Sequence, residues 1–183
     1  MIAEPLWINE VLQFWFDELG DADWFSGEAR VDEDIRRRFL ALHQQLVATD
    51  AAGIQDPRAL LAAVIVLDQF SRNLFRGDPR AYVSDPTARR LASQTVEAGY
   101  DKTMPPRHRL FLYLPFEHSE HAAHQARAIE LISSLDNADW THSAQLHQAL
   151  IDKFGRFPGR NAILGRPSTP AEIEALKGPN ARF

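Results

Sequence analysis

The sequence predicts an all-helical fold, and three observations carry that prediction. Apolar residues recur at intervals of three and four along most of the chain, the spacing that gives an α-helix one apolar face. A capping Asp or Thr stands directly before a proline at three places: Asp56-Pro57, Asp85-Pro86 and Thr169-Pro170. No segment alternates apolar and polar residues over the length of a strand. We therefore expect about seven or eight helices in short-looped antiparallel pairs.

The spacing also predicts where the helices lie. They are expected over residues 5–18, 32–47, 57–74, 86–98, 106–135, 142–154 and 170–177. Pro115 lacks an N–H group and disfavours helical backbone at the preceding residue, so we expect a break or kink there and a restart of the helix. Gly155 is expected to end the helix 142–154. Thr169 and Glu172 have the spacing of a capping box.

Composition indicates one ordinary globular domain over residues 1–183. Hydrophobic residues make up 45% of the chain and charged residues 25%, and eleven Phe and four Trp supply bulky core material. The net charge of −5 argues against a nucleic-acid partner or an anionic membrane surface. The longest apolar run, 60–67, is too short to span a bilayer, and no signal-peptide pattern begins the sequence. A cytoplasmic location is expected.

The first of three polar segments runs from Asp68 to Arg80. Asp68, Arg72 and Arg76 are spaced by four residues, so we expect all three on one helix face, with Asn73 beside them. Arg72 and Arg76 would then form a fork for an anionic ligand. The alternative is an ion pair that ties the helix end to its loop.

The second polar segment is 115–121. If the helix restarts at Pro115, its first turn contains Glu117, His118 and Glu120, and the free N–H groups there favour negative charge. His118 would then stay neutral and, with Glu120, form an acid/base pair. Polarity at an exposed helix start explains the same residues without any chemistry.

A metal site is the least favoured interpretation of this segment. Two Glu–His pairs have a spacing of four residues: Glu117/His121 and Glu120/His124. A second pair of ligands would have to come from elsewhere, such as His147 or Asp68. The chain has no cysteine, which excludes thiolate metal sites, disulfides and cysteine nucleophiles. We expect neither a metal nor another cofactor.

The third polar segment is 153–161. Gly155 ends a helix, and Pro158-Gly159 has the composition of a type II turn. Arg156, Arg160 and Asn161 therefore lie on a tight loop between aromatic residues, an arrangement that suits phosphate or carboxylate. The alternative is that the arginines cap the carbonyl groups at the preceding helix end.

With these segments in view, the chain resembles the bacterial domain of unknown function 924 family. The matching stretches are VLQFWF (11–16), LDQFSRNLFRG (67–77), FLYLPFEHSE (111–120) and FGRFPGRNAILGR (154–166). The resemblance implies a tetratricopeptide-like α/α superhelical fold and no established activity. The chain departs from the family pattern at Ser71, at Gly159, and at His121 and His124, where acidic or amide residues are common. The last departure weakens the metal interpretation further.

The leading functional hypothesis is a small-molecule site for an anionic ligand, and the sequence leaves open whether it is an enzyme. The expected ligand-binding residues are Asp68, Arg72, Asn73, Arg76, Arg156, Arg160 and Asn161, and the expected catalytic residues are His118 and Glu120. The alternatives are a helical adaptor that binds a peptide or protein in a concave groove, and a purely structural polar network. At least two of the three segments are expected to meet through an Arg–carboxylate or His–carboxylate hydrogen bond.

Overall fold

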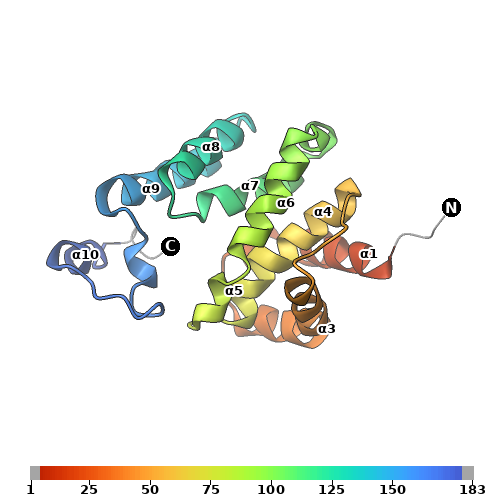
Figure 1. Ribbon diagram of the computed structural model, residues 1–183, viewed down its shortest axis with the longest axis horizontal. Coiled ribbons are helices and arrows are strands. Elements are labelled where there is room, and N and C mark those ends of the chain that lie inside the picture. The colour runs from red at the N-terminus through yellow and green to blue at the C-terminus, as the bar shows by residue number, and fades with distance from the viewer. Residues whose placement is uncertain (1–4, 179–183) are drawn as a thin grey trace. The chain divides into compact units, whose positions relative to one another are not determined.

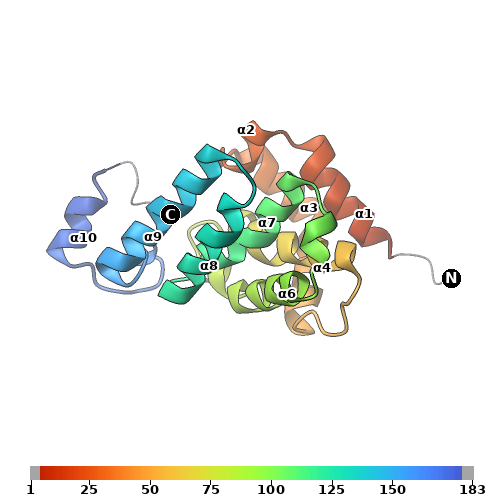
Figure 2. The same cartoon turned by 90° about the horizontal axis from the view of Figure 1, so that it is seen from above.

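The computed structural model describes residues 5–178, which contain helices and turns but no β-strand (Figures 1 and 2). The expected all-helical class is confirmed. The chain divides into two compact units: unit 1 is Met1–Arg76 with Arg80–Met104, and unit 2 is Gly77–Pro79 with Pro105–Phe183. Along the described residues, no helix combines the length and apolar character needed to cross a membrane. The single domain and the tetratricopeptide-like superhelix remain predictions.

Unit 1 is built around one long buried helix. Its α-helices are α1 (Leu6–Gln13), α2 (Asp21–Trp24), α3 (Ala29–Ala48), α4 (Pro57–Val64), α5 (Ser71–Leu74) and α6 (Asp85–Glu97). π-helical turns extend α1 over Phe14–Glu18 and join α4 to α5 over Ile65–Phe70, and 3-10 turns cover Pro79–Tyr82 and Tyr100–Thr103. The expected helix 57–74 is thus continuous but contains a π-helical turn. Its carboxylate cap is Asp56, which accepts hydrogen bonds from the N–H groups of Arg58 and Ala59.

The core of unit 1 is aromatic, as the composition suggests. Phe39 of α3 packs against Phe70 with ring centroids 4.9 Å apart, and Phe14 lies 5.2 Å from Phe39. Trp15 contacts Phe70 edge-on at 5.5 Å. All these rings are buried, so they hold the N-terminal helix and α3 against the end of the 57–74 helix.

The start of α6 corrects one expectation. Ser84, not Asp85, occupies the cap position, and Asp85 is the first helical residue. The Ser84 hydroxyl donates to the carbonyl oxygen of Leu67 at 2.6 Å. Asp85 is buried and its carboxylate binds Arg72, so it is not available to cap the helix.

The described residues of unit 2 contain four α-helices, with a loop between the third and the fourth. They are α7 (Pro106–Glu117), α8 (Ala122–Ser133), α9 (Ala138–Phe154) and α10 (Pro170–Ala175), with a 3-10 turn at Pro158–Arg160. α8 packs beside α9 in both views, and α7 packs against α8 (Figures 1 and 2). Gly155 ends α9 in the left-handed region at φ 68°, and Thr169 and Glu172 form the expected capping box.

Pro115 does not break its helix, contrary to the prediction. α7 continues through Pro115 to Glu117, and the N–H of His118 closes the last turn on the carbonyl of Leu114 at 2.8 Å. The missing N–H of Pro115 removes only one backbone bond, and the helix ends shortly after it. Glu117 therefore lies at the C-terminal end of a helix and not at its start. The helix dipole is negative at this end, so it disfavours the carboxylate that it was expected to stabilise.

The turn at Pro158-Gly159 is also different from the prediction. A type II turn needs a positive φ at its glycine, and Gly159 does not have one. Instead Pro158 begins a 3-10 turn, in which the N–H of Arg160 donates to the carbonyl of Phe157 at 3.1 Å. This tighter turn directs Arg160 inward, and its side chain is buried.

Candidate functional site

Two residues of the first polar segment, Asp68 and Arg72, form an ion-pair cluster with Asp85 within unit 1. Asp68 is fully buried, and its Oδ1 lies 3.2 Å from Nη1 of Arg72. The same guanidinium makes two parallel bonds to Asp85, with Nη1 donating to Oδ1 at 2.8 Å and Nη2 to Oδ2 at 3.0 Å. Burial lowers the pKa of Arg72, but the two carboxylates raise it by more, so the guanidinium stays charged.

Arg76 and Asn73 bind a different carboxylate, that of Asp32 in α3. Nε and Nη2 of Arg76 each donate to Asp32 at 2.8 Å, and Nδ2 of Asn73 donates at 2.7 Å. Burial raises the pKa of Asp32, but the bonds from Arg76 and Asn73 outweigh it and lower the pKa. Arg72 and Arg76 do not form one fork, because α5 ends at Leu74 and Arg76 leaves the helix face.

In unit 2, Glu120 is held by the C-terminal loop. Its carboxylate accepts hydrogen bonds from Nη1 and Nη2 of Arg166 at 2.7 and 2.9 Å, and from the N–H of Phe157 at 2.8 Å. Burial raises the pKa of Glu120, but these donors lower it by more. A carboxylate with this many donors is a poor proton carrier, since they favour its charged form.

Arg156 and Asn161 also have partners within the C-terminal loop. Nε and Nη2 of Arg156 donate to the two oxygens of Glu172 at 2.7 and 2.9 Å, and the arginine holds the pKa of Glu172 at about 2. Asn161 is buried; it donates to Ser168 Oγ at 3.1 Å and accepts from Arg166 Nε at 3.0 Å. The alternative prediction was that the arginines cap the carbonyl groups at the end of the preceding helix. The carbonyl that Nη2 of Arg156 binds is instead that of Pro167, outside that helix.

A buried carboxylate–histidine pair lies beside His118. Nδ1 of His147 in α9 is 3.0 Å from Oε1 of Glu117 and 2.9 Å from the carbonyl oxygen of Ser143. Ser143 Oγ donates to the same Glu117 oxygen at 3.2 Å. The ring of His118 lies 6.3 Å from that of His147, centroid to centroid, so the two imidazoles are neighbours.

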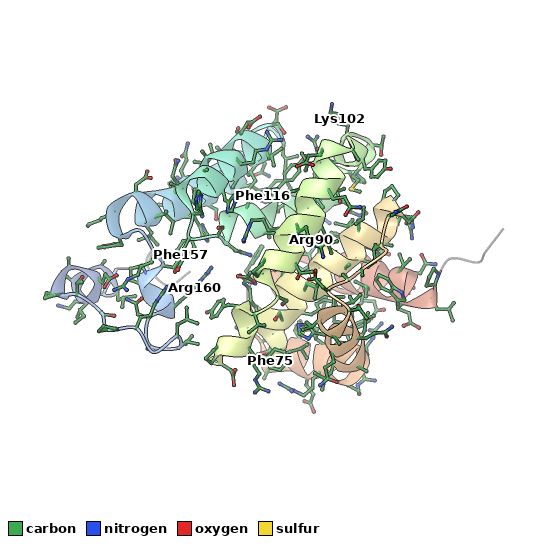
Figure 3. All side chains as sticks on the ribbon, in the orientation of Figure 1. Phe75, Arg90, Lys102, Phe116, Phe157 and Arg160 are labelled. Atoms are coloured by element: carbon green, nitrogen blue, oxygen red, sulfur yellow. The ribbon has the colours of Figure 1, made fainter. Side chains whose placement is uncertain are left out.

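Arg160 brings a positive charge to the same part of unit 2. Its Nη1 donates to the carbonyl oxygen of His118 at 2.9 Å, and its guanidinium carbon lies 4.4 Å from the ring centroid of Phe157. His147 contacts the same ring edge-on at 5.6 Å. Figure 3 labels Phe157 and Arg160 where the chain turns after α9. One buried aromatic ring therefore contacts both the imidazole and the guanidinium.

Gln125 fixes the backbone that follows α7. Its Nε2 donates to the carbonyl oxygens of Glu117 and Ser119 at 2.5 and 2.7 Å, and its side chain is fully buried. The next turn is held by Ser119, whose Oγ lies 2.8 Å from Nδ1 of His124. His118 is therefore presented on a rigid turn although it lies outside a helix.

Two of the three predicted segments thus meet within unit 2. They do so through the backbone: Arg160 binds the His118 carbonyl, and Glu120 binds the Phe157 N–H. The arginine that pairs with Glu120 is Arg166, just beyond the predicted segment. In the first segment, Arg72 and Arg76 belong to unit 1, where their partners are Asp85 and Asp32.

Several site residues were not predicted in these roles. Sequence reasoning missed Asp32, Asp85, Arg166 and Glu172 as ion-pair partners, and considered His147 only as a metal ligand. Arg166 ends the stretch 154–166 that matches the family pattern, and this match could have identified it as a candidate site residue. Within residues 5–178, no group of three or more His, Asp or Glu side chains is arranged to hold a metal ion.

Comparison with known proteins agrees with the fold. No functionally curated protein matches the chain. A solved structure of a protein of unknown function from Agrobacterium tumefaciens is 36% identical, covers 93% of this chain and 97% of its own, and superposes with a TM-score of 0.88. The model of the family described as "Bacterial protein of unknown function (DUF924)" matches residues 11–180. Since that match spans nearly the whole chain, the protein belongs to this family.

Proposed function

We propose that the protein binds a small anionic molecule in unit 2, at a site formed by His118, His147 and Arg160. The observation that carries the proposal is the contact between Arg160 and His118, which places a buried guanidinium and an imidazole-bearing turn together. A guanidinium and an imidazole are side chains that bind phosphate and carboxylate groups.

The pairing of the other predicted arginines supports this choice. Arg72, Arg76 and Arg156 each use two nitrogens to bind a carboxylate of the protein itself. Such bidentate bonds occupy the edge of the guanidinium that would otherwise bind an anionic ligand. One bond of Arg160 goes to the carbonyl oxygen of His118. For the unit 1 cluster, mutual pairing favours the structural interpretation over the ligand-binding one.

Within the proposed site, His118 remains the candidate catalytic residue and Glu120 does not. Glu120 accepts three hydrogen bonds that favour its charged form, whereas His118 is half-buried on a turn held by Gln125. Any proton transfer would therefore use His118 and His147. We also propose a cytoplasmic location and no nucleic-acid partner; the net charge of −5 supports the second of these.

The test is a titration of the full-length, 15N-labelled protein with inorganic phosphate, sulfate and malonate at constant ionic strength. We expect saturable amide shifts around His118, His147 and Arg160 with at least one of these anions. Arg160→Gln should weaken the affinity about tenfold, since it removes a charge-assisted hydrogen bond. The matched control is Arg109→Gln, which removes a half-buried arginine that binds Tyr113 and Ser134 elsewhere in unit 2.

Shifts that are unsaturable with every anion, or that occur only away from these residues, would contradict the proposal. If Arg160→Gln does not fold, His118→Gln tests the same contact site without removing a buried charge. Saturable binding by the wild-type protein that is unaffected by both variants would place the anion elsewhere and reject the site.

A further inference from the structure

We propose that the start of α8 is a pH-sensitive device, in which a proton on His121 releases the cap of the helix. The side chain of His121 caps α8, because its Nδ1 accepts a hydrogen bond from the N–H of Ala123 at 3.3 Å. The residues preferred at this position are Ser, Thr, Asp and Asn, whose oxygens remain acceptors near neutral pH. An imidazole differs from them, since it titrates between about pH 5 and 8. The device does not depend on an anion being bound.

The bond to Ala123 requires a neutral His121 ring with its proton on Nε2. A backbone N–H can only donate, so Nδ1 must carry the lone pair that accepts from it. Protonation of the ring places a hydrogen on Nδ1, and two donors then face each other. The cap bond is therefore made only by the neutral ring, and the N–H of Ala123 loses this acceptor as the pH falls.

A charge on the His121 ring is also disfavoured by its surroundings. The first turn of a helix carries a partial positive charge, which repels a cation at the N-terminus. The ring of His124 lies 4.8 Å from that of His121, centroid to centroid, and is itself titratable. Two protonated imidazoles at this distance repel each other. Both effects favour an arrangement in which the charged His121 ring has left the helix start.

The bond of His124 to Ser119 responds differently to protonation. Nδ1 of His124 lies 2.8 Å from Oγ of Ser119, and the same hydroxyl accepts from the N–H of His121 at 3.3 Å. A hydroxyl can donate to a neutral Nδ1 or accept from a protonated one. The contact between Ser119 and His124 is therefore compatible with both charge states, whereas the cap bond of His121 is compatible with only one.

Charged groups near this turn, on the elements packed against α8, bind other partners. They are Glu117 of α7 with His147 of α9, Glu120 with Arg166, and Arg160 with the carbonyl oxygen of His118. The amide of Gln125, which does not titrate, holds the carbonyl oxygens of Glu117 and Ser119. Opening should therefore be confined to the first turn of α8 and should leave the end of α7 in place.

The test is NMR of the full-length, 15N-labelled protein from about pH 8 to 5, the range in which imidazoles titrate. The amide signal of Ala123 should shift with the same midpoint as the imidazole nitrogens of His121, because the cap opens as the ring is protonated. His121→Asn replaces the ring by a cap that does not titrate, so the shift of the Ala123 amide should be lost. The matched control is His142→Asn, at an exposed position of α9, which should leave the shift unchanged.

Urea unfolding measures the size of the effect. Between about pH 7.5 and 5.5, the unfolding equilibrium constant of the wild type should rise about fivefold relative to that of His121→Asn, the equivalent of one helix cap. The other histidines are common to both proteins, so their contributions cancel. A constant ratio across this range would contradict the proposal.

Two further results would also overturn it. One is an Ala123 amide that does not respond while His121 titrates, and the other is an amide whose midpoint follows the ring of His124 instead. Should His121→Asn fail to fold, the wild-type protein still decides the question. A neutral His121 ring with its proton on Nδ1 cannot accept from Ala123, so 15N chemical shifts that show this tautomer would refute the cap.

Discussion

Arg72 and Asp85 are thirteen residues apart in the sequence, and their side chains form two parallel hydrogen bonds of 2.8 and 3.0 Å. The guanidinium also neutralises Asp68, which has no exposed surface. One cation therefore serves two buried carboxylates, and it links the long helix of unit 1 to α6.

Arg72→Ala should lower the free energy of unfolding by about 2–4 kcal/mol, because it removes a charged partner shared by the buried carboxylates of Asp68 and Asp85. Urea denaturation at neutral pH measures the loss. The control is Arg90→Ala, whose partner Asp50 is 68% exposed on the side chain. An exposed pair contributes less than about 1 kcal/mol. Equal losses in the two variants would mean that burial of the carboxylates has no energetic consequence.

Glu120→Gln tests whether the carboxylate has a structural role. It should destabilise the protein by about 1.5–3 kcal/mol at neutral pH, because charge-assisted bonds from Arg166 and Phe157 are weakened. The folded state lowers the pKa of Glu120 below 4.5, so its stabilisation is present above that pH and is lost as the pH falls through the folded value.

The destabilisation caused by Glu120→Gln should accordingly shrink below about pH 4.5. A double-mutant cycle with Arg166→Met isolates the ion pair. Glu130→Gln is the matched control, because Glu130 pairs with Arg127 on an exposed surface. A pH-independent difference between wild type and Glu120→Gln would show that the charge of this carboxylate does not contribute.

Gly155→Ala should destabilise unit 2 by about 1 kcal/mol, since Gly155 ends α9 at φ 68°, where a side chain is strained. An added Cβ would meet nothing within 4 Å, so the cost is conformational and not steric. Gly155→Asn should therefore cost less than Gly155→Ala, because Asn tolerates the left-handed region better. Thermal unfolding of the two variants checks the order, and the reverse order would implicate packing.

Local features of the fold could be predicted because they depend on neighbouring residues. Asp56-Pro57, Gly155 and the Thr169 capping box each fix a helix end through contacts a few residues away. The π-helical turn at Ile65–Phe70 could not, because its residues have the same apolar character as an ordinary helix. The predicted break at Pro115 was wrong because the effect of a proline depends on its distance from the helix end, and α7 ends only two residues later, at Glu117.

The polar partners were harder to predict because ion pairing acts over long sequence separations. Asp85 before a proline has the composition of a helix cap, and nothing local shows that Arg72 binds it instead. Likewise, Asp32 is 44 residues from Arg76, and no local pattern shows that the two side chains form an ion pair. The sequence shows which side chains are charged, but the packing of the helices determines which of them form ion pairs.

His43 of α3 has a buried imidazole in unit 1. Among the described residues, neither of its ring nitrogens has a hydrogen-bond partner, and its ring lies 5.4 Å from that of Phe75. Burial lowers the pKa of His43 below 6.5. As the pH falls below that value, the unfolded chain binds a proton that the folded protein excludes, so stability decreases by at most about 1.4 kcal/mol per pH unit from this group.

His43→Leu should remove this contribution, and it should also stabilise the protein near pH 7.5 by about 1 kcal/mol, because two unsatisfied nitrogens are replaced by an apolar side chain. Urea unfolding of both proteins between about pH 7.5 and 5.5 measures the difference. The other histidines are common to both proteins, so their effects cancel, and the gap in stability should widen as the pH falls. The exposed His142, changed to Leu, should show no such widening. Parallel pH profiles for wild type and His43→Leu would mean that the folded protein accepts the proton at His43 as readily as the unfolded chain does.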